Sequence, residues 1–153
     1  MLIRSILRGA AAGAAGTTAL NAVTYLDMTW QARPESETPK ATVERIADLA
    51  DVEVPGSGDD KENRTSALGA LSGIVTGVGV GALYGLVRGL GFRPPWWAAT
   101  PLVTGVVLAG SNGPMVGLGV TDVKEWSGAD WASDIVPHLA YGVVTALVAA
   151  DAD

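Results

Sequence analysis

The chain has 153 residues, 48% of them hydrophobic, a formal net charge of −6 and no cysteine. The length predicts one compact unit, and the missing cysteines exclude disulfides, thiol catalysis and cysteine metal sites. A single histidine argues against a histidine-based metal cluster, and the acidic balance argues against a nucleic-acid partner. Four apolar stretches and a positive mean hydropathy instead indicate an all-α, multi-pass integral membrane protein.

The first apolar stretch follows two arginines, Arg4 and Arg8, and is rich in glycine and alanine. A basic start before an apolar run is also typical of a secretory signal peptide. This run is long for a signal peptide and three more stretches follow, so we interpret it as an uncleaved helix over about residues 5–26. Gly9 and Gly13 give this helix a smooth face against which another helix could pack.

Residues 28–64 form a polar loop with nine acidic and five basic residues. Thr38 followed by Pro39 is typical of a helix start, with Thr38 as the N-cap. Apolar residues then recur at helical spacing, at Val43, Ile46, Ala47 and Ala50. The loop is therefore predicted to hold a short amphipathic helix that rests on the bundle or on the lipid headgroups.

The second stretch, residues 66–88, is organised by glycines spaced four residues apart, which we call the glycine ladder. Its members are Gly69, Gly73, Gly77, Gly81, Gly85 and Gly89. From Gly69 to Gly89 a helix is about 30 Å long, close to the thickness of a bilayer core. Because a spacing of four exceeds 3.6 residues per turn, the ladder drifts by ~40° per step and different parts of it should face different neighbours.

The third and fourth stretches cover about residues 97–119 and 133–150 and form a second hairpin after the first. Trp96 and Trp97 mark a membrane entry. The triplet Asn112-Gly113-Pro114 interrupts the third stretch, and it predicts either the end of the span or a broken helix.

Orientation follows from basic residues beside the spans. The arginines on one side place both termini in the cytoplasm: Arg4, Arg8, Arg88 and Arg93. The basic residues of the 28–64 loop, together with Lys124, favour the opposite orientation. We give more weight to the arginines because they lie directly against the spans.

A candidate polar site comprises Asn21, Asn112, Asp134, His138 and Tyr141. Asp134 and His138 are four residues apart and share one helical face. A nearby carboxylate favours a charged imidazole, which would make the pair respond to protons. The alternative is that Asp134 caps the helix and His138 packs at the membrane interface.

The chain shows no nucleophile–base pair, phosphate-binding loop or metal-ligand spacing, so we predict no enzymatic activity, cofactor or metal. The ladder favours a structural or accessory bundle, with the bilayer and a second copy or another membrane protein as partners. The alternative is a small transporter or channel that uses the candidate polar site.

The span pattern, the polar group at Asn112-Gly113-Pro114 and the sequence His138-Leu-Ala-Tyr-Gly142 resemble small uncharacterised bacterial four-helix inner-membrane proteins, and more loosely the YagU-like group. The resemblance implies four spans in the inner membrane. It supplies no catalytic residues, and the acidic 28–64 loop lies outside the pattern.

Overall fold

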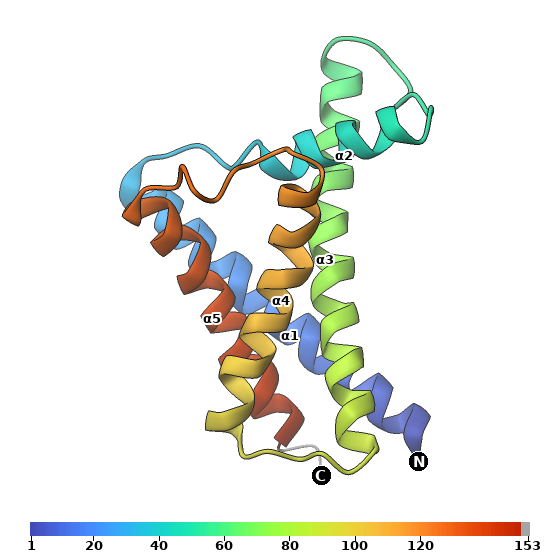
Figure 1. Ribbon diagram of the computed structural model, residues 1–153, viewed down its shortest axis with the longest axis vertical. Coiled ribbons are helices and arrows are strands. Elements are labelled where there is room, and N and C mark those ends of the chain that lie inside the picture. The colour runs from blue at the N-terminus through green and yellow to red at the C-terminus, as the bar shows by residue number, and fades with distance from the viewer. Residues whose placement is uncertain (151–153) are drawn as a thin grey trace.

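The computed structural model describes residues 1–150, and in this part of the chain the fold is all-helical, with five helices and no strand (Figure 1). Four helices are long and one is short. They are α1 (Leu2–Gln31), α2 (Thr38–Leu49), α3 (Asp59–Gly89), α4 (Trp96–Gly117) and α5 (Gly128–Ala150).

The long helices run up and down, so that connections and termini gather at two opposite ends (Figure 1). α1 packs against α3 and α5, and α5 also packs against α4. One end holds the start of α1, the loop 90–95 and the end of α5, and we call it the arginine end. The other holds the loops 32–58 and 118–127 with α2, and we call it the acidic end.

The core is made mostly of alanine and valine, together with two tyrosines. Its members are Ala12, Tyr84, Ala99, Val103, Val107, Tyr141, Ala146 and Ala149. The helices lie close together here, because alanine and glycine let their backbones meet where leucine or phenylalanine would hold them apart.

The short helix α2 is present in the predicted loop, but its start differs from the prediction. Glu37, not Thr38, is the capping residue, and no side chain makes a capping hydrogen bond. The Thr38 N–H instead donates to Ser36 Oγ at 3.3 Å, outside the helix. The first turn therefore depends on Pro39, whose fixed backbone angle suits this position.

The triplet Asn112-Gly113-Pro114 does not interrupt its helix. α4 continues to Gly117, with Pro114 inside it. Pro114 lies only three residues from the end, where its carbonyl accepts the closing bond from Leu118 N–H. Pro114 lacks the N–H that would bond to the Gly110 carbonyl, so α4 loses one hydrogen bond there, and the helix nevertheless continues to Gly117.

Two described helices, α3 and α5, are long and apolar enough to cross a bilayer. Only 22% of the apolar segment of α3 and 33% of that of α5 is buried. The mean hydropathy of α1 is lowered by glycine, threonine, two arginines and an asparagine, and that of α4 by two tryptophans, two prolines and an asparagine.

Candidate functional site

Four polar side chains meet where the acidic-end half of α4 packs on α5: Ser111, Asn112, Asp134 and His138. Asn112 Nδ2 donates to Asp134 Oδ2 at 2.8 Å, and Ser111 Oγ lies 3.1 Å from His138 Nε2. The His138 and Asp134 side chains are only 13% and 17% exposed. Three residues of the predicted polar site therefore come together, and Ser111 joins them.

The imidazole of His138 is oriented by its own helix. Its Nδ1 lies 2.7 Å from the backbone carbonyl oxygen of Asp134 and 3.4 Å from Asp134 Oδ1. A carbonyl oxygen can only accept, so Nδ1 carries a proton in this geometry. The other ring nitrogen, Nε2, faces Ser111.

The Ser111 hydroxyl can serve either state of that ring. It lies 3.0 Å from the Val107 carbonyl as well as 3.1 Å from His138 Nε2. With neutral His138, the hydroxyl donates to Nε2. With charged His138, Nε2–H donates to Ser111 Oγ and the hydroxyl turns to Val107, so both states are satisfied without moving a helix.

The order Ser111–His138–Asp134 also has the connectivity of a serine hydrolase triad. The supporting groups differ, because Nδ1 faces a backbone carbonyl more closely than the carboxylate. Ser111 lies inside α4, where backbone N–H groups are taken up by the helix, and the Asn112 amide is committed to Asp134. Donors for an oxyanion are therefore not arranged around Ser111, and we do not assign it a nucleophilic role.

Asp134 does not cap its helix, because α5 begins at Gly128, more than a turn earlier. The cap belongs to Ser127 and Asp130. Asp130 Oδ2 accepts from Ser127 N–H at 2.8 Å and from its hydroxyl at 2.7 Å, and Ser127 Oγ accepts from Asp130 N–H at 3.2 Å. These bonds lower the pKa of Asp130. The capping alternative for Asp134 was wrong because the helix extends beyond its apolar segment.

The other two predicted polar residues lie elsewhere. Asn21 is half-buried on α1 and makes no side-chain hydrogen bond within residues 1–150. Tyr141 is fully buried, and its hydroxyl donates to the Gly77 carbonyl at 2.6 Å, which joins α5 to α3. The hydroxyl of Thr145 reaches the Ala12 carbonyl of α1 at 3.4 Å. Tyr141 and Thr145 therefore link helices, and neither they nor Asn21 extend the polar cluster.

The ladder glycines do not share one surrounding. A Cβ on Gly81 would lie 2.5 Å from Gly13 Cα, and one on Gly85 would lie 2.8 Å from Gly9 Cα. Gly77 faces side chains of α1 and α5, Gly89 faces the start of α1, and Gly69 faces α2. Gly73 has no atom within 4 Å of such a Cβ.

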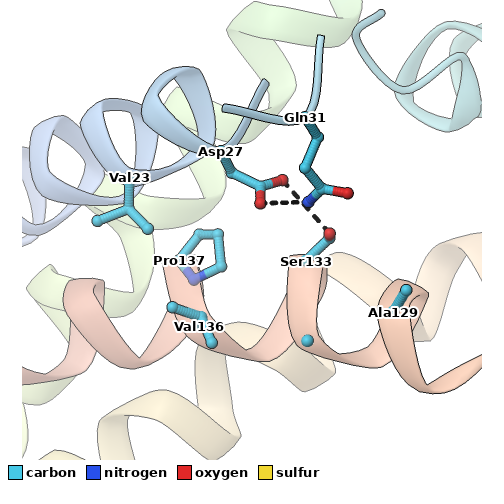
Figure 2. Close-up of a pocket in the computed structure, with 8 residues that line it drawn as sticks. Val23, Asp27, Gln31, Ala129, Ser133, Val136 and Pro137 are labelled. Atoms are coloured by element: carbon cyan, nitrogen blue, oxygen red, sulfur yellow. Dashed lines mark hydrogen bonds between the residues drawn. The ribbon is translucent and has the colours of Figure 1, made fainter. Parts of the chain in front are cut away.

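A second group of polar residues borders a cavity of about 240 Å³ between α1 and α5 (Figure 2). Asp27, Gln31 and Ser133 lie at one side of it, opposite Val23, Val136 and Pro137. Ser133 Oγ donates to Asp27 Oδ2 at 3.3 Å.

Asp27 lies just beyond the predicted span of residues 5–26 and is saturated with donors. Arg33 contributes an ion pair at 2.7 Å and a hydrogen bond at 2.8 Å, and Gln31 Nε2 donates at 2.5 Å. Hydrogen bonds from Arg33 and then Gln31 lower the pKa of Asp27. The sequence carried no signal for the link to Ser133, which is 106 residues away.

Metal chemistry has no support in residues 1–150, where no group of three or more His, Cys, Asp and Glu side chains could hold an ion. The described arrangement holds α4 and α5 together through polar contacts between their side chains. Comparison with protein-family models, with curated proteins and with solved structures gives no match to this chain.

Proposed function

We propose that the chain is an integral protein of the cell's inner membrane that crosses the bilayer four times, with α1, α3, α4 and α5. The observation that carries this is the exposed apolar surface of the long helices. On α3 it comprises Leu68, Leu71, Ile74, Val75 and Leu83, and on α5 it comprises Ile135, Val136, Leu139, Leu147 and Val148. Soluble monomers rarely expose continuous apolar surfaces of this kind, whereas lipid tails accept them.

The tryptophans support the same proposal, because all five lie near the two ends of the bundle. Trp96 and Trp97 start α4 at the arginine end. Trp30, Trp126 and Trp131 lie at the acidic end, where Trp126 and Trp131 pack edge to face with ring centroids 5.0 Å apart. Tryptophans gather at both membrane interfaces, and a helix from Trp131 to Ala150 is about 29 Å long.

Within the membrane we propose a structural or accessory role for a bundle packed through the glycine ladder. Two of the bonds between helices are made by polar side chains of the helices: Tyr141 on Gly77, and Asn112 on Asp134. Such contacts stabilise a bundle in lipid. Association with a second copy or another membrane protein is part of this proposal.

The membrane location is tested by placing a charge on the exposed apolar surface. Val75 on α3 is 69% exposed, and Val52 in the loop after α2 is 62% exposed. Asp at a bilayer centre costs about 2.5–3.5 kcal/mol, whereas an exposed substitution in water changes stability by only about ±0.5 kcal/mol. Val75→Asp should sharply reduce the membrane-integrated fraction, and the control Val52→Asp should not. Equal fractions would refute the membrane location.

A second candidate function is a small transporter or channel that responds to protons. The observation in its favour is that Ser111 can satisfy both protonation states of His138. In proteoliposomes, a proton flux that depends on Asp134 and His138 would support it, with Asp134→Asn and His138→Gln abolishing the flux and Asp122→Asn preserving it. No flux in the wild type would favour the structural role.

A further inference from the structure

The cavity between α1 and α5 has apolar walls and a polar rim, and these lie in a fixed order along the bundle (Figure 2). Asp27, Gln31 and Ser133 form the rim. Val23 lies one turn before Asp27 on α1, and Pro137 lies one turn after Ser133 on α5, so both are deeper in the bundle. The lining therefore changes from apolar to polar toward the acidic end.

The cavity lies between two places where α1 and α5 meet. Deeper in the bundle, a Cβ on Gly16 would lie 2.8 Å from Tyr141 Cδ2, so the two helices are in contact there. At the rim, Ser133 Oγ donates to Asp27 Oδ2 at 3.3 Å. The small side chain of Ala132 leaves space beside this bond. The cavity therefore narrows to a helix contact at its deep end and is widest near its rim.

The charge at the rim is already compensated. Asp27 is the one charged residue among the described residues that line the cavity, and Arg33 pairs with it at 2.7 Å. A cationic or anionic ligand would therefore meet no free counter-charge and would lose its hydration on entry. The rim is suited to an uncharged group.

Two rim residues keep unused hydrogen-bonding capacity. Gln31 Nε2 donates to Asp27, which leaves its second N–H, and within residues 1–150 the Gln31 Oε1 accepts no hydrogen bond. The Ser133 hydroxyl donates to Asp27 and keeps its own lone pairs as acceptors. Because the rim offers both donors and acceptors, it is matched by a hydroxyl group, which can accept and donate.

We propose that this cavity binds a single-chain amphiphile with an uncharged hydroxyl head, with its alkyl chain against Val23 and Pro137 and its hydroxyl at Gln31 and Ser133. The inference rests on the proposed membrane location, which puts the rim at headgroup level, next to Trp30 in the chain, and the apolar end in the hydrocarbon. The volume of about 240 Å³ is below the ~300–1,000 Å³ of sites for drug-sized ligands, so a short chain fits.

The test uses the full chain with isotope-labelled valine methyl groups in an uncharged detergent, followed by NMR. It is titrated with hexanol, hexylammonium or hexanoate, which share one chain length. With hexanol, the methyl signals of Val23 and Val136 should shift and saturate. Those of Val148, an exposed valine near the other end of α5, should change only in proportion to the hexanol added. The two charged probes should bind at least about tenfold more weakly, because neither finds a free counter-charge.

Two variants locate the ligand. Ala132→Leu should abolish saturation, because it places a larger side chain in the cavity, and Ala70→Leu, at an exposed position of α3, should bind like wild type. Gln31→Met should weaken hexanol binding about threefold to tenfold, because one hydrogen bond to the head is lost. Asn63→Leu, which removes an exposed amide from α3, is its control and should leave binding unchanged.

Shifts that do not saturate, or that are alike at Val23 and Val148, would overturn the site. Tighter binding of hexylammonium or hexanoate than of hexanol would overturn the uncharged head. Unchanged binding in Ala132→Leu would overturn the location between α1 and α5. A chain that inserts into membranes, as judged by the Val75→Asp comparison, and fails this test leaves the proposed function standing.

Discussion

At the scale of single residues, several glycines lie where a Cβ would collide with the backbone of another helix. Because Gly81 has no side chain, α1 can approach α3 closely at this position. A Cβ on Gly73 would meet no atom within 4 Å, so no helix approaches there. The sequence could show that these positions repeat, but the repeat alone does not distinguish a contact from an open face. That distinction comes from the path of α1, which crosses α3 at Gly9 and Gly13.

These two glycines give a matched pair of variants. Gly81→Ala should destabilise the bundle by on the order of 1–3 kcal/mol, because the new Cβ would lie 2.5 Å from Gly13 Cα. Gly73→Ala should be neutral or stabilising by up to about 1 kcal/mol, because alanine favours helix and meets nothing. Thermal unfolding in detergent measures both. Equal effects would contradict the close contact.

A second residue-scale prediction concerns acid. Arg33 and Gln31 lower the pKa of Asp27, so its stabilising contribution is present above the ordinary carboxyl value of 3.8 and is lost as pH falls through the lower folded pKa. Asp27→Asn should remove this part of the acid sensitivity. The check is the unfolding temperature followed below pH 3.8, with Glu35→Gln as the control. The same acid profile in Asp27→Asn and wild type would count against the network.

At the scale of elements, all five helices were predicted, and the differences lie at their ends. α3 begins at Asp59 and not near residue 66, because Asp59, Asp60 and Glu62 favour a helix N-terminus. α5 begins at Gly128 and not at residue 133, because Ser127 and Asp130 cap it. The hydropathy pattern shows where an apolar segment ends, whereas a helix ends where its backbone hydrogen bonds end.

The cap of α5 can be tested directly. Ser127→Ala should destabilise the first turn of α5 by about 1 kcal/mol, because it removes the hydroxyl that donates to Asp130 and accepts from its N–H. Hydrogen exchange at the amides of residues 129–133 should accelerate about fivefold. Ser57→Ala, in the loop before α3, is the control. Unchanged exchange in Ser127→Ala would show that the helix start does not depend on this cap.

At the scale of the whole molecule, the packing of the helices decides which polar side chains meet. The sequence predicted one candidate site of five residues, with Asp134 and His138 as a pair, and α4–α5 packing brings Asn112 to that pair. It could not separate them from Asn21 and Tyr141, because which face of a helix meets which neighbour depends on tertiary packing. The same packing divides the polar groups into a cluster, a cavity border and helix links.

The central claim is that four helices cross the membrane, and cysteine accessibility tests it most directly in a chain that has no natural cysteine. Single cysteines replace Ser5 in the first turn of α1 and Ser57, Phe92 and Glu125, one in each connection between long helices. Phe92 is chosen for the loop 90–95 because its neighbour Gly91 has a φ of 106°, which disfavours a side chain. In intact cells, an impermeant thiol reagent should label Ser57→Cys and Glu125→Cys and spare Ser5→Cys and Phe92→Cys until the cells are lysed. If only α3 and α5 crossed, positions 5 and 57 would behave alike and positions 92 and 125 would behave alike, and that pattern would contradict the account.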